Sequence, residues 1–549
     1  MKRFLSFLTL SLLLGIGVAN AQNQRTVVLE CFTSATCGPC ASANPALDNL
    51  VNNNADKLIA IKYHVNWPVA GDPMNLHNPS EVSSKVSYYG INSVPYSVGD
   101  GTWSGLSSSV NQTKVDQWAA VPSPLEMRMT YYLNNTQDTI YVIVMGRATS
   151  DITSDNLRLN IAVLEKTMTY TSAPCASSNG ERVFHNVMKK LLPTATGTAI
   201  PAMQTGDYFA YKYSWALANV MNVSELTAVA WVQDYSTKQI FQGCQTLDEF
   251  QPFYAKQAKI SAIDHAKKKV CSGSMNPYII IDNFGYEPIN SLLLNVSVNG
   301  APVTQLGWNG VIEPGRSGKI DLGNLYFGFT SNNNMSISIA QINGAADDYA
   351  PSIFNYDFES SALICNQTFK LVIRTDDDPQ AITWDVVNTA NGDIVAAGGP
   401  YDEAHHNYNE EFNLDESGCY TLTIYDAMGN GLASGNGLYG LKVGSQTIIA
   451  GSSFTDKESN DFSFSKYEDI SETPVNTVNI YPNPSNGIVT VEAEEGGMLK
   501  VYNTAGQKVV EQSIDGKTTL NLSSLDKGTY LIVLTDMYGA SNKQVIVLQ

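Results

Sequence analysis

The chain has few charged residues, and basic residues are the scarcer kind. Lys and Arg number 33 against 52 Asp and Glu, and the formal net charge is -19. Nucleic acids and anionic membrane surfaces repel so acidic a chain, so neither is expected as a partner. Charged residues make up only 15% of the sequence, whereas Tyr and Gly are plentiful. This profile favours antiparallel sheets and turns over surface helices.

Long hydrophobic runs are also scarce. The one at residues 4–18 follows Lys2 and Arg3, and it precedes a small-x-small site that ends at Ala21. It is too short to span a bilayer, and polar residues follow it directly, so we predict a signal peptide over residues 1–21. No later run is long enough to cross a membrane, so no transmembrane segment is expected in the mature chain. The predicted exported compartment permits disulfides.

Cysteine is rare, with eight residues in 549. Eight cysteines are too few for a fold held together mainly by disulfides, so we expect isolated structural disulfides and one reactive site. The pairing of Cys31, Cys175, Cys244 and Cys271 stays open, because spacing alone does not establish connectivity. Cys175 and Cys244 flank one predicted unit and are one candidate pair.

The sequence Thr-Cys-Gly-Pro-Cys at residues 36–40 is the motif around which the chain is organised. It follows an apolar run at residues 26–32, so a strand is expected to lead into a helix at this point. Unpaired N–H groups and the positive end of a helix dipole lower a thiol pKa at a helix N-terminus. Cys37 is therefore the candidate nucleophile. Cys40, one turn later, is placed to close the internal disulfide and release a substrate thiol.

Three segments resemble thioredoxin: VVLECFTSATCGPC (27–40), LIAIKYHV (58–65) and YGINSVPYSV (89–98). The resemblance implies an α/β thioredoxin-like domain over residues 22–122, a redox disulfide between Cys37 and Cys40, and a cis bond before Pro95 that places this proline against the disulfide. Two positions depart from the family. Thr36 stands where the family has tryptophan, and Cys31 stands where it has a buried carboxylate.

Cys31 has two interpretations, as a small apolar core residue or as a third thiol near the pair. The first is favoured because free cysteines are commonly buried. Glu30 is adjacent in sequence. Neighbouring side chains of a strand point to opposite faces, so Glu30 is not expected to replace the missing carboxylate.

Period-2 alternation begins after a predicted helix at residues 107–120. The runs at 127–133, 139–148, 157–170 and 226–234 predict a β-sandwich domain over residues 123–252. Between them, His185 lies in an apolar, helix-like stretch, and we interpret it as structural. The order of a CGPC domain followed by this sandwich resembles a Bacteroidetes family of outer-membrane-related proteins with a thioredoxin-like N-terminus and no assigned reaction.

Two further β-sandwiches are predicted. Residues 253–274 are predicted to form a helical or linker passage. It stands at the start of a predicted immunoglobulin-like domain that extends to residue 360. Residues 361–465 resemble CUB-like extracellular modules through the Asp-Ala-Met-Gly-Asn-Gly run at 426–431. Cys365 and Cys419 are expected to form a structural disulfide that contributes about 2 to 4 kcal/mol. His405 and His406 read as a solvated loop pair.

Calcium is the alternative to an ordinary tight turn in this module. The oxygen ligands would come from Asp376, Asp378 and Asp426. Asn430 replaces the second acidic residue of the CUB-like turn, and tight turns commonly use Asp, Asn and Gly, so the turn is favoured and no cofactor is expected.

The C-terminal segment is separated by a predicted linker at residues 466–477. Residues 478–549 contain YPNP (481–484), VYNTAG (501–506) and GTY (528–530) between alternating runs. These motifs closely resemble the type IX secretion C-terminal sorting domain. The resemblance implies recognition by the type IX secretion machinery and export through the outer membrane, as a secreted or cell-surface protein.

The expected fold is thus multidomain, with an N-terminal α/β thioredoxin-like domain followed by several all-β immunoglobulin-like or jelly-roll sandwiches. Two function classes follow. In the first, the protein is a thiol-disulfide oxidoreductase acting on protein thiols and disulfides, in which Cys37 attacks, Cys40 resolves and Pro95 shapes the substrate groove. In the second, the thioredoxin-like unit is a non-catalytic scaffold in a surface binding or adhesion protein. The CGPC sequence favours the first.

Overall fold

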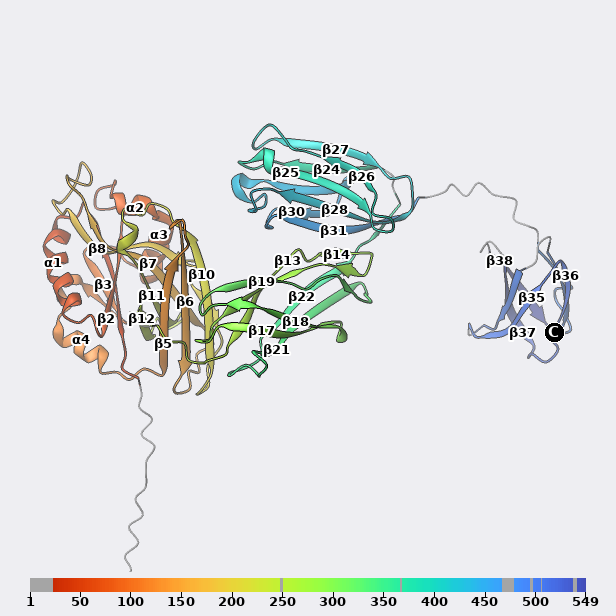
Figure 1. Cartoon of the computed structure of the whole chain (residues 1–549), viewed down its shortest axis with the longest axis horizontal. Coiled ribbons are helices and arrows are strands. Elements are labelled where there is room, and N and C mark those ends of the chain that lie inside the picture. The colour runs from red at the N-terminus through yellow and green to blue at the C-terminus, as the bar shows by residue number, and fades with distance from the viewer. Residues whose placement is uncertain are drawn as a thin grey trace, which may run out of the picture. The chain divides into compact units, whose positions relative to one another are not determined.

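The computed structural model describes residues 23–246, 250–365, 368–466, 478–493, 497–504, 506–536 and 541–549. The predicted signal peptide and nearly all of the predicted linker at 466–477 lie outside these residues. The chain forms two compact units, one of Met1–Ser360 with Lys457–Ser459 and the other of Ser361–Asp456 with Asn460–Gln549 (Figure 1). In the described part of the chain, no helix is both long enough and apolar enough to cross a membrane.

The first unit begins with alternating strands and helices. These elements are β1 (Val27–Thr33), α1 (Gly38–Asn52), β2 (Leu58–His64), α2 (Pro73–His77), α3 (Pro79–Tyr89), β3 (Tyr96–Gly99), β4 (Trp103–Leu106), η1 (Ser107–Ser109) and α4 (Gln112–Ala119). Strands β1 and β2 are parallel, and every residue of both is buried, as expected of parallel strands covered on both faces. Strand β3 adds to β1 in the antiparallel sense.

The next segment adds strands to the same sheet. Its elements are β5 (Leu125–Leu133), β6 (Thr139–Ala148), β7 (Leu157–Thr169), β8 (Val183–Leu192), β9 (Thr198–Ile200), β10 (Tyr208–Ala216), η2 (Val223–Glu225), β11 (Leu226–Asp234) and β12 (Ile240–Gln245). The sheet order is β12-β11-β7-β8-β2-β1-β3-β4, with β9 on β7, and a second sheet has the order β10-β6-β5. The predicted boundary at residue 122 therefore divides the strands of one continuous sheet.

The core also continues across that boundary. On one face of the sheet, Leu29 of β1 belongs to a buried cluster with Leu47 of α1 and Val115 of α4. On the other face, Phe32 belongs to a cluster that includes Val82 of α3 and Trp231 of β11. Helices α1 and α4 are drawn in red and orange at one side of this sheet in Figure 1.

The helix-like interpretation of the stretch around His185 is wrong. His185 lies in β8, which pairs with β7 on one side and with β2 on the other. A strand in the middle of a sheet that is covered on both faces carries a nearly continuous apolar sequence, and periodicity alone does not distinguish it from a buried helix.

The third segment of the first unit is all-β, as expected of a sandwich. Its strands are β13 (Ala258–Asp264), β14 (Lys269–Val270), β15 (Ser274–Met275), β16 (Tyr278–Asn283), β17 (Ile289–Val298), β18 (Ala301–Ile312), β19 (Ser317–Asp321), β20 (Leu325–Tyr326), β21 (Asn332–Ile342) and β22 (Ile353–Ser360). The sheets β13-β16-β19 and β14-β22-β21-β17-β18 enclose one apolar cluster. The helical reading of residues 253–274 is wrong, because this passage forms β13, β14 and β15 instead.

The second unit contains a sandwich and the C-terminal tail. The sandwich consists of β23 (Leu363–Ile364), β24 (Thr368–Arg374), η3 (Pro379–Ala381), β25 (Ile382–Asn388), β26 (Ile394–Gly398), β27 (Asn407–Asn413), β28 (Gly418–Asp426), η4 (Ser434–Asn436), β29 (Leu438–Val443), β30 (Gln446–Gly451) and β31 (Lys457–Phe464). Its sheets are β23-β31-β28-β25-β26 and β27-β24-β29-β30.

The tail forms two small antiparallel sheets, β32-β33-β36 and β35-β34-β37-β38. Its strands are β32 (Asn479–Tyr481), β33 (Ile488–Glu492), β34 (Gly497–Tyr502), β35 (Lys508–Ile514), β36 (Lys517–Asn521), β37 (Gly528–Asp536) and β38 (Ser541–Leu548). A separate apolar cluster that includes Val489, Leu499 and Ile532 forms its core.

Candidate dithiol site and the secretion tail

Cys37 and Cys40 form a disulfide at the start of α1, with their Cα atoms 5.3 Å apart. Cys37 is the N-cap of this helix, and its Sγ accepts a hydrogen bond from the Cys40 backbone N–H at 3.1 Å. Pro39 occupies the first turn, where its missing N–H removes no helical hydrogen bond. The strand-to-helix junction predicted for this motif is therefore present, and it directs the Cys40 backbone N–H at the Cys37 sulfur.

The segment before β3 contacts the disulfide. The bond between Val94 and Pro95 is cis, which confirms this part of the prediction. The Val94 carbonyl oxygen lies 3.7 Å from the Cys37 Sγ. Pro95 and Pro39 also line one groove of about 540 Å³, whose wall includes Leu50 of α1. The proline of the CGPC motif and the cis proline thus border a single groove with a mixed apolar and polar wall.

The loop between β7 and β8, residues 170–182, covers the other side of the Cys37-Cys40 motif. The Asn179 backbone N–H donates to the Ala35 carbonyl at 2.7 Å, and the Asn179 Nδ2 donates to the Cys37 carbonyl at 2.9 Å. Cys37 is only 1% exposed and Cys40 is 0% exposed. The disulfide is therefore enclosed by residues far from it in the sequence.

A buried histidine-aspartate pair supports the turn before the motif. Asp72 Oδ2 accepts from the Ala35 backbone N–H at 2.6 Å and lies 2.9 Å from the His64 Nδ1. Asp72 Oδ1 accepts from the Met74 N–H at 2.8 Å at the start of α2. Burial raises the pKa of Asp72, but His64 and the backbone hydrogen bonds outweigh burial and hold it below its ordinary value. Sequence reasoning missed this pair, although an Asp directly before Pro73 is a readable N-cap signal.

Cys31 lies under α1, with 2% of its surface exposed, and its burial raises the pKa of the thiol to about 12. It is paired in register with Lys62, whose Nζ lies 2.6 Å from an Asp48 carboxylate oxygen of α1. Glu30 faces the opposite side of the sheet, as predicted, where it accepts from the Tyr63 hydroxyl at 2.9 Å. This environment fits the interpretation of Cys31 as a small apolar core residue.

One candidate pairing that the sequence left open does not form. Cys175 and Cys244 are both free thiols, so they do not form a pair with each other. Cys271, by contrast, is disulfide-bonded.

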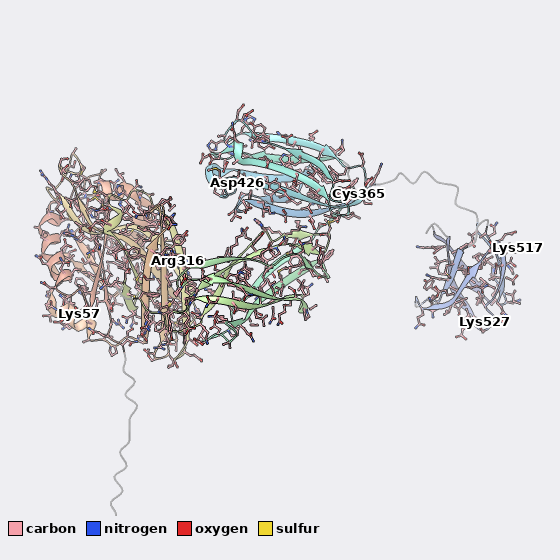
Figure 2. The ribbon with its side chains drawn as sticks, viewed as in Figure 1. Lys57, Arg316, Cys365, Asp426, Lys517 and Lys527 are labelled. Carbon is pink, nitrogen blue, oxygen red and sulfur yellow. A yellow bond between two sulfur atoms is a disulfide. The ribbon has the colours of Figure 1, made fainter. Side chains whose placement is uncertain are left out.

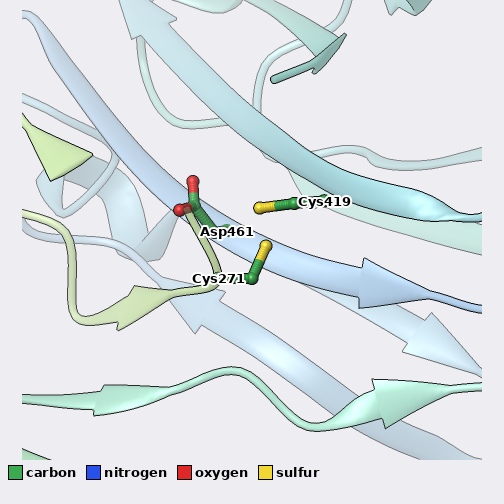
Figure 3. Close-up of side chains that lie close together, drawn as sticks. All are labelled: Cys271, Cys419 and Asp461. Atoms are coloured by element: carbon green, nitrogen blue, oxygen red, sulfur yellow. The ribbon is translucent and has the colours of Figure 1, made fainter. Parts of the chain in front are cut away.

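The predicted disulfide between Cys365 and Cys419 is wrong. Cys365 is exposed and free (Figure 2), whereas Cys419 is disulfide-bonded. Cys365 follows β23, and β31 lies between β23 and the β28 strand that carries Cys419. Figure 3 shows Cys419 beside Asp461 of that intervening strand. Two strand spacings are about 9.5 Å, beyond the Cα separation of about 7 Å that a disulfide spans.

Asp426 and Asp376, two of the calcium candidates, accept hydrogen bonds from the backbone of their own turns. Asp426 is buried, and its carboxylate accepts from the backbone N–H groups of Met428 at 3.0 Å and of Asn430 and Gly431, each at 2.8 Å. Asp376 accepts from the Asp378 N–H at 3.0 Å. These contacts are those of Asx turns, which supports the turn interpretation.

One tail motif is hydrogen-bonded to a distant strand. Asn483, in the Tyr-Pro-Asn-Pro motif, donates from Nδ2 to the Val545 carbonyl at 2.7 Å and accepts from the Val547 N–H at 3.0 Å. This motif is thereby fixed to β38, the last strand of the chain.

Residues 479–548 match the family model of the secretion system C-terminal sorting domain. The chain therefore carries a type IX secretion sorting domain in its C-terminal tail. It is exported through the outer membrane and is either secreted or held at the cell surface, and its tail interacts with the secretion machinery. No curated protein sequence matches the chain.

Solved structures show low overall similarity to it. HBP35 of Porphyromonas gingivalis aligns with a TM-score of 0.35 and 16% identity, covering 61% of this chain and 98% of its own. The mixed-linkage glucan utilization locus protein SGBP-B of Bacteroides ovatus, in complex with a mixed-linkage heptasaccharide, aligns with a TM-score of 0.15 and 11% identity, covering 55% of this chain and 69% of its own.

Proposed function

We propose that the N-terminal part of this secreted or surface protein is a thioredoxin-like thiol-disulfide oxidoreductase that uses Cys37 and Cys40. The observation that carries the proposal is the Cys37-Cys40 disulfide at the N-terminus of α1 with the Val94 carbonyl 3.7 Å from the Cys37 Sγ. A structural staple requires neither the helix N-terminus nor the flanking prolines. Together they stabilise a thiolate and present a backbone beside it.

The reaction is an exchange of two electrons between dithiols and disulfides. In the reduced protein, the Cys37 thiolate attacks one sulfur of a substrate disulfide, the substrate S–S bond breaks, and the first substrate thiolate leaves and takes up a proton. Cys40 then loses its proton and attacks the Cys37 Sγ, and the mixed disulfide breaks to release the second substrate thiol. The substrate is reduced and the Cys37-Cys40 disulfide forms. The reverse sequence oxidises a substrate dithiol.

The groove beside Pro39 and Pro95 suits an extended peptide. Its wall includes the apolar side chains of Leu50 and Leu106, and Pro39, which lies between the two cysteines in sequence, borders it. A protein segment in this groove would place its own cysteine near the Cys37 Sγ. Protein thiols and disulfides are therefore the substrates we propose.

A second candidate function is a non-catalytic surface binding protein in which this region is a scaffold. The observation that favours it is burial, because Cys37 is 1% exposed and Cys40 is 0% exposed. A sulfur that is attacked by a substrate thiolate must be reachable along the S–S axis. In the scaffold alternative the disulfide is a staple, and binding lies on the sandwiches.

Reduction of insulin disulfides by the exported chain, with dithiothreitol as the electron donor, separates these functions. We expect turnover above the dithiothreitol background that is lost in Cys37→Ser. An intact Cys37-Cys40 disulfide after incubation with glutathione and thioredoxin, together with no turnover, would support the scaffold instead.

A further inference from the structure

One sheet of the third segment has an outward face built from side-chain amides and hydroxyls. Strands β22, β21, β17 and β18 are neighbours in this sheet (Figure 1), and their inward residues pack in the apolar core of the sandwich. The outward positions that alternate with them include Asn295, Gln305, Asn334, Asn355, Ser336 and Ser338. We call these six residues the amide face. The four amides are exposed, and the two serines are half-buried.

The strand register aligns part of the amide face in a row across four strands. Asn295 is paired with Gln305 on one side and with Ser338 on the other. Ser338 is paired in turn with Ile353, whose side chain is 62% exposed and forms the apolar end of the row. Opposed side chains of neighbouring strands lie about 5 Å apart. The row is therefore one continuous strip of surface.

A parallel row ends in a surface cavity. Asn334 is paired with Asp357 and donates from its Nδ2 to the Asp357 Oδ1 at 2.8 Å. Both residues line a cavity of about 670 Å³ together with Asn299, whose Oδ1 accepts from the Asn334 backbone N–H at 3.0 Å. Two lysines and two acidic residues line this cavity, so their charges balance, and Lys269 pairs with Glu359 at 3.2 Å. The cavity is thus polar without net charge.

Solvent exposure alone does not account for the composition of the amide face. Asn is depleted in strands, yet it recurs here on three neighbouring strands. The opposite sheet of the same sandwich, β13-β16-β19, instead carries charged residues at outward positions, namely Lys259, Asp282 and Lys319. Places where a sequence departs from the local preference of its fold are commonly functional sites. The contrast between the two sheets therefore indicates a ligand for the amide face.

Neighbouring amides hold one another in place and keep part of their hydrogen-bonding capacity. The Gln305 Nε2 donates to the Asn295 Oδ1 at 2.9 Å. Among the described residues, neither the Asn295 Nδ2 nor the Gln305 Oε1 has a hydrogen-bond partner. This pair therefore offers a donor and an acceptor side by side. Side chains that are already fixed lose less conformational entropy when a ligand binds.

The composition of the amide face selects among ligand classes. None of its six residues is charged, so it has no cation to neutralise a polyanion. It also lacks the Tyr, Trp, Met and Arg that are enriched in protein interfaces, and it contains Ser, which is depleted there. A hydroxyl both donates and accepts hydrogen bonds, as a side-chain amide does. A neutral ligand with many hydroxyls matches this face, and the exposed Ile353 offers a contact for its C–H groups.

We propose that the amide face binds a neutral polysaccharide. Hydroxyls of the chain bond to the Asn295-Gln305 pair and to Asn334 at the edge of the cavity. The inference goes beyond the proposed oxidoreductase and is independent of it, because no residue of the dithiol site takes part.

Affinity electrophoresis of the full exported chain tests the proposal, since retardation in a native gel detects weak binding. Soluble mannan, β-glucan, galactan and arabinoxylan are each cast into a separate gel, and heparin serves as the polyanion. Mobility is measured relative to a gel without polysaccharide. We expect at least one of the four neutral polysaccharides to retard the chain, and the retardation should persist at high salt. Heparin should cause none.

Asn295→Asp is the sharpest variant. It keeps the oxygen that accepts from Gln305 and removes the free N–H donor, so the contact within the sheet is retained while a ligand hydrogen bond is lost. We expect the Kd for the retarding polysaccharide to rise roughly 5-fold, and further in the Asn295→Asp, Asn334→Ala double variant. Asn409→Ala, at an exposed asparagine of β27 in the other sandwich, is the matched control and should bind as the native chain does. Thermal unfolding of each variant checks that it is folded.

Four outcomes would overturn the inference. Failure of all four neutral polysaccharides to retard the native chain would show that it binds none of them. Retardation that the folded double variant leaves unchanged would place binding elsewhere on the chain. Retardation by heparin alone, lost at high salt, would assign a polyanion. Dimerisation of the native chain in light scattering, abolished in the double variant, would assign the face to a second copy. Disulfide exchange should be the same in all variants, so none of these outcomes bears on the proposed oxidoreductase.

Discussion

The backbone N–H of Cys40 donates to the Sγ of Cys37 at 3.1 Å. In the reduced protein the same N–H faces the sulfur that must carry negative charge. A hydrogen bond to the charged form of a group lowers its pKa, and the helix N-terminus acts in the same direction. Under the proposed function, this hydrogen bond gives Cys37 the attacking role and leaves Cys40 as the resolving cysteine.

This asymmetry predicts different products from two serine variants. Cys37→Ser should abolish disulfide exchange. Cys40→Ser should still attack a substrate disulfide but should accumulate a covalent mixed disulfide, because the second thiol is missing. Non-reducing mass spectrometry after mixing with a disulfide peptide measures the adduct. A trapped adduct on Cys37→Ser instead would reverse the assigned roles.

Alkylation of the native chain should separate its free cysteines by burial. Cys365 is exposed and Cys175 is partly exposed, whereas Cys31 and Cys244 are buried with thiol pKa values of about 12. At pH 8, iodoacetamide should label the first two quickly and the last two only after unfolding, because the thiolate is the reactive form. Peptide mass spectrometry reads out each site. Rapid native labelling of Cys31 would favour its role as a third reactive thiol.

The His64-Asp72 pair predicts a loss of stability in acid. The pKa of Asp72 lies below its ordinary value of 3.8 in the folded state, so the pair stabilises the fold above that pH and this contribution disappears as the pH falls through the lowered pKa. Asp72→Ala should cost about 3 to 5 kcal/mol at pH 7, as expected for breaking a buried pair, and less in acid. Urea unfolding of residues 22–360 at pH 7 and pH 3 measures both effects.

The matched control for this variant is Asp116→Ala. Asp116 pairs with Lys57 at 2.7 Å, and both side chains are at least partly exposed. Figure 2 labels Lys57. Removing an exposed pair should leave the unfolding curve unchanged at both pH values. A comparable loss in the two variants would show that the buried position of Asp72 has no special effect.

The continuous sheet predicts that the first segment does not fold alone. A fragment that ends at residue 122 lacks β8, the neighbour of β2, and it lacks Trp231, which belongs to the core on that face. We expect the fragment of residues 22–122 to show no cooperative thermal transition and fast exchange of the β1 and β2 amides. The fragment of residues 22–360 should unfold cooperatively. A sharp transition in the shorter fragment would establish an autonomous domain.

The turn at Asp426 predicts indifference to calcium. Its carboxylate already accepts three backbone N–H groups, so an added ion should leave the Tm of the chain unchanged at millimolar concentration. Asp426→Ala should cost about 1 to 3 kcal/mol, because buried donors lose their acceptor. Calorimetry of the exported chain, with calcium and with a chelator, tests this. A rise in Tm that Asp426→Ala abolishes would contradict it.

Local patterns predicted much of this chain. The junction at Cys37 and the tail strands depend on short sequence runs with one dominant structural solution. The strand at β6 begins and ends at the predicted residues, since Thr139–Ala148 alternates between two turns. The cis bond before Pro95 is predicted from the resemblance to thioredoxin, whereas the β6 strand is predicted from the alternation of its residues.

The failures involve contacts between distant segments. Nothing near His185 indicates that β8 will be a central strand, because the partners β2 and β7 are set by the whole sheet. The same holds for Asn179, whose polar loop sequence resembles that of any connection. Cys365 and Cys419 lie at strand edges as expected, but the order of strands, which places β31 between them, is a property of topology that spacing does not encode.

The pairing of β2 with β8, which joins Lys62 to Val187, also affects how the protein matures. Cys37 and Cys40 precede β8 in the chain. The loop that encloses them reaches its folded position only when β8 pairs with β2. Contacts between such distant segments form slowly because a long loop must close first. The burial of Cys37 and Cys40 is therefore a property of the completed sheet, and it is absent from any state of the chain in which β8 is unpaired.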